Sequence, residues 1–408
     1  MTSMPARDWA VLISARSVRM FAYGFLSVVL ALYLSAIGYS PVAIGLLFTV
    51  ALAGSAATST AVSLLVDRWG RRQVLVASAL AMTVTGVGLA TQTAFGVMLA
   101  LAALGGLSPT GQEVGPFQPI EQAVLSRSSA AARVMPYAWY NLAGTLAAAF
   151  GALAAGLVPA ALQAWGWQPL AAQRAAAWAF AGSGVALAIL YTTLSRAVEA
   201  VPETHPDLRG GLRRSRRIVF GLTGLFAADA LAGGFVVQSL VVLWFHQRFG
   251  VDLESLGVLF FGANLLAALS YLPAAWLSER FGLLRTAVFT HLPSNILLAC
   301  VPLMPTWPLA AAMLLARQAL SNMDVPTRQA YTMAIVTPGE RAAAAGLTNA
   351  IRPAAASVAP VLAGAALATA ASGLPFLLAG GIKVAYDVAL WLVFRRVPLL
   401  AGGESPRR

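Results

Sequence analysis

The stretch Asp67-Arg68-Trp69-Gly70-Arg71-Arg72 is a short charged turn between two long apolar runs of the chain. A related stretch, Glu279-Arg280-Phe281-Gly282-Leu283-Leu284-Arg285, lies 212 residues later (279 − 67) between two further apolar runs. The same kind of turn therefore occurs twice, at equivalent points of two half-chains.

Other short sequences repeat at nearly the same spacing. Gly24-Phe25 recurs as Gly234-Phe235, Gly45-Leu46-Leu47-Phe48 as Gly257-Val258-Leu259-Phe260, Pro119-Ile120-Glu121-Gln122-Ala123 as Pro326-Thr327-Arg328-Gln329-Ala330, and Asn141 as Asn349. The offsets drift only between 207 and 212 residues (326 − 119 and 257 − 45), which indicates small loop deletions. We infer one ancestral half that was duplicated.

The composition predicts a membrane protein. Of 408 residues, 59% are hydrophobic and only 10% are charged, whereas a soluble domain carries roughly 25% charged residues. Continuous apolar runs of about 20 residues are typical of membrane-spanning helices rather than of β-barrel strands. About twelve such spans are expected, at 10–36, 41–66, 73–93, 95–125, 133–160, 171–195, 218–246, 254–277, 286–304, 308–336, 342–369 and 374–394.

The repeat divides this all-α polytopic protein into two pseudo-symmetric six-helix bundles. The predicted parts are a first bundle at 1–195, a cytoplasmic linker at 196–217, a second bundle at 218–396 and a cytoplasmic tail at 397–408. The linker carries prolines and glycines among its charges. Arg16 and Arg19 interrupt the first apolar run, so that run is predicted to be a retained helix rather than a signal peptide.

The net charge of +12 follows from where the arginines lie. They concentrate at alternate helix ends and in the linker, which by the positive-inside rule predicts that both termini are cytoplasmic. The positive charge therefore orients the protein in the bilayer, and no nucleic-acid partner is expected.

Residues for enzyme chemistry are missing from the pattern. Cys300 is the sole cysteine, the three histidines have no metal-ligand spacing, and the sole lysine, Lys383, is followed by valine. A phosphate-binding loop needs Lys before Ser or Thr. We therefore expect no enzyme activity, no cofactor and no metal site.

The predicted fourth and tenth spans contain prolines at matching places. Ser108-Pro109, Gly115-Pro116 and Pro119 interrupt one, and Pro326 interrupts the other. Broken helices at equivalent positions of two halves indicate a transport cavity.

The chain resembles the major facilitator superfamily, secondary transporters built from two six-helix halves. The resemblance rests on the loop pattern G-x-x-x-D-R-x-G-R-[KR], which Asp67, Arg68, Gly70, Arg71 and Arg72 match, with Ser63 in place of the first glycine. It implies alternating access, with this loop and its copy at Glu279, Arg280, Gly282 and Arg285 as cytoplasmic latches. It also implies a bacterial twelve-helix protein of the inner membrane that functions as a monomer.

Charges inside the predicted spans are costly and therefore mark function. Arg19 and Asp229 occupy equivalent positions (229 − 19 = 210) near mid-membrane with opposite signs. They either pair with each other as a coupling site or a permanent salt bridge, or both face water and substrate. Asp229 is the leading candidate for a protonatable coupling residue.

A second sign reversal relates Glu121 to Arg328 (328 − 121 = 207). Glu121 is placed to accept from Arg68 or Arg71, and Arg328 to donate to Glu279. Alternatively, Glu121 and Arg328 meet across the halves as a cytoplasmic gate.

Further charged and polar residues complete the candidate site. Glu113 and Asp324 are cavity acids or partners of freed backbone groups and Arg317, and Lys383 with Asp387 (i, i+4) is expected to be a self-neutralising pair. Possible substrate contacts are Tyr23, Tyr140, Asn141, Gln238, Asn264 and Arg352.

Two functions remain open for a small-molecule substrate in the lipid bilayer. The first is proton-coupled export of a small organic compound through Asp229, Glu113 and Asp324, which the resemblance of the glycine-rich fifth span to the family's antiporter helix favours. The second is uptake or exchange of an organic anion held by Arg19, Arg328 or Arg352. A receptor or scaffold without transport is the remote alternative.

Overall fold

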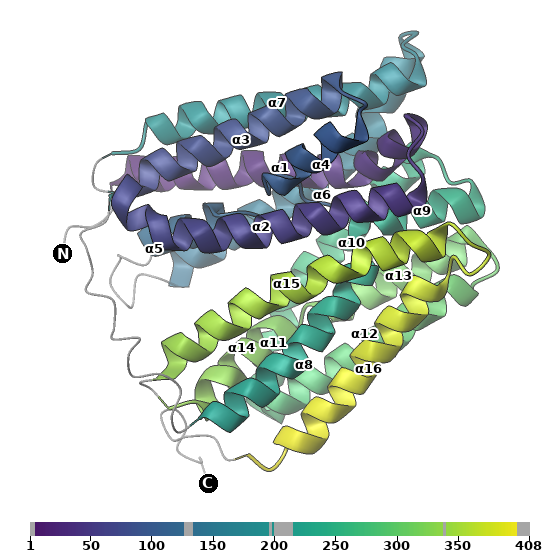
Figure 1. The fold of residues 1–408 in the computed structure, drawn as a ribbon. Helices are drawn as coiled ribbons and strands as arrows, with labels where there is room; N and C mark the ends of the chain where they lie inside the picture. Colours follow the sequence, from purple (N-terminus) through teal and green to yellow (C-terminus); the bar gives the residue numbers. More distant parts are fainter. Residues whose placement is uncertain (1–4, 126–133, 196–197, 200–214, 338–339, 398–408) are drawn as a thin grey trace. The chain divides into compact units, whose positions relative to one another are not determined.

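The computed structural model describes residues 5–125, 134–195, 198–199, 215–337 and 340–397, and its regular elements are helices (Figure 1). Most of the predicted linker 196–217 and nearly all of the tail 397–408 lie outside the described residues.

Seven α-helices lie among the described residues of the first half. They are α1 (Ala6–Ala36), α2 (Pro41–Trp69), α3 (Arg71–Thr91), α4 (Phe95–Ala103), α5 (Phe117–Leu125), α6 (Val134–Ala164) and α7 (Pro169–Thr192). The second half supplies α8 (Arg216–Phe235), α9 (Gln238–Phe249), α10 (Leu253–Leu269), α11 (Tyr271–Phe281), α12 (Leu283–Cys300), the 3-10 turn η4 (Val301–Leu303), α13 (Trp307–Ser321), α14 (Asp324–Ile335), α15 (Arg341–Leu367) and α16 (Leu374–Phe394).

Ten segments of the described chain are long and apolar enough to cross a membrane. The two predicted spans missing from these ten, 95–125 and 308–336, are the ones with prolines at matching places of the two halves, and each is divided into two shorter helices. In the first break, side chains satisfy freed backbone groups: Ser108 Oγ donates to Gln112 O at 2.6 Å, and Gly115 N donates to Ser55 Oγ at 2.8 Å. The predicted break therefore lies where the sequence placed it.

Two further interruptions were not expected. The predicted span 218–246 is divided into α8 and α9 at Val236 and Val237, and the span 254–277 into α10 and α11 at Ser270. None of these residues is a proline or glycine. Breaks were predicted only where prolines interrupt a span at matching places of the two halves, so none was predicted here.

The described helices form two compact units that differ from the predicted halves. Unit 1 comprises Met1–Glu203 with Val236–Leu265 and Ser357–Ser372, and unit 2 comprises Thr204–Phe235, Leu266–Ala356 and Gly373–Arg408. In unit 1, α1 packs against α6, α7 and α9, and α3 packs against α7. In unit 2, α12 packs against α13, α14 and α16, and α8 packs against α16. The predicted domain boundaries remain a prediction.

Candidate functional site

The two charged loops have the same backbone. Gly70, between α2 and α3, has φ 84° and ψ 142°, and Gly282, between α11 and α12, has φ 88° and ψ 156°. Residues with side chains rarely adopt positive φ, so both turns depend on glycine. The repeat seen in the sequence is thus a repeat of local structure.

Glu199 closes the first loop, and sequence reasoning missed it. Its carboxylate accepts hydrogen bonds from the backbone N–H groups of Arg71 (2.7 Å) and Arg72 (3.3 Å), at the start of α3. A helix N-terminus favours an anion because its N–H groups have no partners within the helix. Glu199 lies within the predicted linker 196–217, so a search for charges inside the spans did not consider it.

Replacing Glu199 with alanine is expected to loosen this turn. The change removes an anionic cap worth about 1 kcal/mol, so limited proteolysis of the α2–α3 loop should become faster. Glu254→Ala, at an exposed acidic position in the first turn of α10, is the matched control. Equal cleavage rates for the two variants would contradict the assignment.

The remaining loop residues lie at the surface. The side chains of Arg68, Glu279, Arg280 and Arg285 are exposed, and the Arg280 guanidinium lies over the Trp276 ring at 5.6 Å. The Asp67 side chain lies outside the described residues. The latch role of these residues stays a prediction.

Buried charges of unit 1 form a network around Arg19. Its guanidinium pairs with Glu121 (Nη2–Oε2, 2.6 Å) and Glu113 (Nε–Oε1, 2.8 Å), and Glu113 also contacts Arg16. Tyr140 and Tyr191 donate their hydroxyls to Glu121 at 2.5 and 2.7 Å. Arg19 and Glu121 are both 0% exposed. Two arginines and two carboxylates make this network formally neutral.

Buried charges of unit 2 gather around Asp229. Its Oδ2 contacts Arg328 Nη1 at 3.1 Å and Arg352 Nη1 at 3.2 Å, and its Oδ1 contacts Lys383 Nζ at 2.5 Å. Arg328 Nη1 also pairs with Asp324 Oδ2 at 3.1 Å. With three cations and two carboxylates, this group has a formal charge of +1 (3 − 2).

The two networks contain equivalent ion pairs in which the positive and negative residues have exchanged places. Arg19 with Glu121 and Asp229 with Arg328 occupy equivalent positions of the two halves, and each pair lies inside its own unit. Each of the four residues thus has an opposite charge beside it within its own unit. The hypothesised Arg19–Asp229 pair and the Glu121–Arg328 gate pair stay predictions. Glu121 accepts from Arg19 and from two tyrosines, and its pairing with Arg68 or Arg71 stays a prediction.

The α16 charges also have other partners than expected. Lys383 binds Asp229, whereas Asp387 contacts His291 Nδ1 at 2.8 Å and accepts from Asn295 Nδ2 at 2.8 Å. The prediction of mutual neutralisation between Lys383 and Asp387 is wrong, because α16 packs against both α8 and α12 and each of these helices offers a partner. His291 and Asn295 were missed since nothing near them in the sequence is charged.

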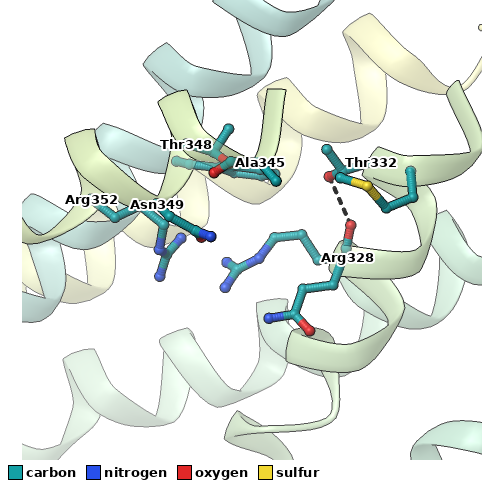
Figure 2. Close-up of a pocket in the computed structure, with 9 residues that line it drawn as sticks. Arg328, Thr332, Ala345, Thr348, Asn349 and Arg352 are labelled. Atoms are coloured by element: carbon teal, nitrogen blue, oxygen red, sulfur yellow. Dashed lines mark hydrogen bonds between the residues drawn. The ribbon is translucent and has the colours of Figure 1, made fainter. Parts of the chain in front are cut away.

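A cavity of about 250 Å³ opens beside the Asp229 group (Figure 2). Its lining residues come from α8, α14 and α15: Phe226, Arg328, Gln329, Thr332, Met333, Ala345, Thr348, Asn349 and Arg352. Figure 2 shows the guanidinium groups of Arg328 and Arg352 directed toward the same space. Arg352 is the more accessible of the two, with a side chain 30% exposed against 10% for Arg328.

The acids lie behind this cavity. Asp229 and Asp324 are 4% and 5% exposed, and neither is among the described residues that line it. Phe226 supports both cations, with its ring 5.2 Å from Arg328 Cζ and 5.9 Å from Arg352 Cζ. The cavity wall therefore carries two positive charges, and both of them lie against the Phe226 ring.

The other predicted substrate contacts are dispersed. Gln238 donates to Ser27 Oγ at 2.7 Å inside unit 1, and Asn141 is exposed. Tyr23 and Asn264 are buried in unit 1, and the Tyr23 hydroxyl has no hydrogen-bond partner among the described residues. Of the six substrate contacts predicted from the sequence, only Arg352 lines the cavity.

Comparisons with known proteins match the chain to one family. The Major Facilitator Superfamily model matches residues 12–316 and, again, residues 223–408. The uncharacterized membrane protein YJR124C of Saccharomyces cerevisiae is 27% identical over 422 residues, covering 95% of this chain and 94% of that protein. A yeast relative leaves the bacterial inner membrane a prediction.

Solved structures have the same fold at low identity. The nucleoside transporter NupG matches with a TM-score of 0.74 and 14% identity, covering 95% of this chain and 99% of that one. A bacterial homologue of the iron transporter ferroportin matches with a TM-score of 0.72 and 14% identity, covering 95% and 98%. The predicted all-helical, multi-pass architecture is confirmed. This chain belongs to the Major Facilitator Superfamily and is a secondary transporter rather than an enzyme.

Proposed function

We propose that this chain transports a small organic anion and that the anion binds in the cavity of unit 2. The supporting observation is the pair Arg328 and Arg352, whose guanidinium groups face one space that no carboxylate lines among the described residues. Guanidinium groups bind carboxylate and phosphate through paired N–H donors. Asn349, Thr348 and Gln329 add neutral polar groups at the same wall.

Charge balance favours an anion over a cation. The acids considered for a cation or proton site, Glu113, Asp229 and Asp324, are each paired with an arginine. A buried carboxylate already paired with cations has little attraction left for a cationic substrate. The formal charge of +1 around Asp229, by contrast, is neutralised by one bound monoanion.

The orientation of the chain in the membrane is part of the same proposal. The arginine pattern supports cytoplasmic termini, and the loops at Gly70 and Gly282 would then be the cytoplasmic latches. Alternating access would expose the anion site to each side in turn.

Arg352→Gln is expected to lower anion transport at least about tenfold, because a hydrogen bond to a charged group is worth about 1.5–3 kcal/mol. The measurement is uptake into proteoliposomes, with a panel of radiolabelled monocarboxylates, dicarboxylates, organic phosphates, amines and sugars. Arg341→Gln, on α15 but outside the cavity lining, is the matched control. Transport of amines or sugars without anions, or an unchanged rate in Arg352→Gln, would refute the proposal.

Proton-coupled export of a small organic compound is the second candidate. The observation that favours it is the contact of His291 with Asp387 at 2.8 Å, with His291 Nε2 4.0 Å from Asp229 Oδ1. Histidine is the side chain that most readily changes charge near neutral pH. The same vesicles with an imposed pH gradient test this candidate: flux that is independent of the gradient in both directions excludes it.

A further inference from the structure

Asp229 holds the two cavity arginines together. One oxygen of its carboxylate, Oδ2, accepts from Nη1 of Arg328 and from Nη1 of Arg352, at 3.1 and 3.2 Å. The side chain comes from α8, whereas the arginines come from α14 and α15. A single internal carboxylate thus links three helices through the same groups that face the cavity.

The other oxygen is held independently. Oδ1 accepts from Lys383 Nζ, which is buried on α16. Asp229 therefore has a cation partner that does not line the cavity. If its contacts to the arginines were broken, the carboxylate would keep a partner, and this matters because an uncompensated buried charge costs about 3–5 kcal/mol.

We propose that Asp229 is a tethered competitor that the transported anion displaces from Arg328 and Arg352. This inference rests on the anion-transport function proposed above. When no anion is bound, Asp229 pairs with both arginines. In the loaded site, the anion takes its place while Lys383 retains Asp229.

Charge accounting supports the exchange. Asp229, Asp324, Arg328, Arg352 and Lys383 together have a formal charge of +1 (3 − 2). A monoanion brings the group to zero, and every charged group keeps an opposite charge beside it. A cation in the same place would raise the charge to +2, which the low-dielectric surroundings penalise.

The exchange also selects the substrate. An anion that replaces one shared carboxylate oxygen must reach both guanidinium groups at once, so a compact carboxylate or phosphate fits better than a diffuse anion. Displacement transfers the link between α14 and α15 from the protein to the substrate. Loading of the site is thereby connected to the packing of α8 against these helices.

The test is binding of benzoate and of inorganic phosphate to the purified full chain, measured by titration calorimetry. Asp229→Asn is expected to bind the better probe about tenfold more tightly than wild type, because the competitor has lost its charge. Lys383→Met is expected to bind it at least fivefold more weakly, since Asp229 then depends on the arginines alone, and Lys383→Arg should restore wild-type affinity. Asp229→Asn combined with Lys383→Met should behave like Asp229→Asn.

Three outcomes separate the explanations. Equal or weaker binding in folded Asp229→Asn overturns displacement while leaving the anion site in place. If Asp229→Asn does not fold, wild-type affinity in Lys383→Met overturns displacement by itself. If folded wild-type protein binds no probe and transports no anion from the panel, the anion-transport function itself is wrong.

Discussion

Arg19→Leu is expected to destabilise unit 1 more than any other single charge removal in the first half. Arg19 is fully buried and contacts both Glu113 and Glu121. Its loss leaves Glu121 with two tyrosine hydroxyls and no cation. Breaking a buried ion pair from one side costs about 3–5 kcal/mol. For a chain of this size we expect the melting temperature to fall by about 5–10 °C, measured by fluorescence-detected size exclusion after heating.

Arg7→Leu is the matched control for this change. Arg7 lies on the same helix, α1, but its side chain is exposed, so its removal should leave the melting temperature nearly unchanged. The double variant Arg19→Leu with Glu121→Leu should be less damaged than Arg19→Leu, because it buries no unpaired charge at Glu121. Full stability of Arg19→Leu would show that the network does not brace the unit. Recovery on exchanging Glu121→Arg with Arg328→Glu would show that these two residues pair across the halves.

The charged residues of these ion pairs could be identified from the sequence, but which residue pairs with which could not. The duplication places Arg19 opposite Asp229 and Glu121 opposite Arg328 in an alignment of the two halves. Equivalent positions each take their partner from their own half, so alignment alone does not bring them together. The informative signal was that both members of one contact had reversed sign, as expected when a pair is preserved with its charges exchanged.

Other parts of the site depended on packing that sequence spacing does not encode. The i, i+4 spacing of Lys383 and Asp387 favoured a mutual pair, but Asp229 and His291 lie closer to them because α8 and α12 flank α16. Composition and proline positions, by contrast, were enough to predict the spans and the breaks between α4 and α5 and between α13 and α14. Those features are set by local chemistry: apolar length and missing backbone donors.

Gly364→Leu is expected to abolish most transport while leaving the chain folded. Two close helix contacts in unit 1 are copies of one another: Gly45 of α2 meets Gly364 of α15, and Gly156 of α6 meets Gly257 of α10. The repeat relates them, since Gly45 and Gly257 are 212 residues apart and Gly156 and Gly364 are 208 apart (257 − 45 and 364 − 156). Each contact joins a helix of the first half to a helix of the second.

Neither contact has room for a side chain. A Cβ at Gly257 would lie 2.7 Å from Gly156 Cα, and one at Gly364 would lie closer still to the carbonyl oxygen of Pro41. The obstacles are backbone atoms, so a larger residue forces the helices apart at a cost of about 1–3 kcal/mol or more. Each 1.4 kcal/mol shifts a conformational equilibrium about tenfold. A transporter that rocks one half against the other must close such contacts once in every cycle.

Thiol labelling distinguishes an open contact from a misfolded protein. Ser239 of α9 is fully buried in unit 1, where its hydroxyl donates to Ser27 O at 2.6 Å. In a Cys300→Ser background, Ser239→Cys should react slowly with a membrane-impermeant maleimide in otherwise wild-type protein and at least tenfold faster with Gly364→Leu. Gly182→Leu, at a glycine of α7 with nothing within 4 Å of its added Cβ, is the control and should keep both transport and slow labelling. If Gly364→Leu transports normally and labels slowly, the paired glycine contacts play no part in the transport cycle.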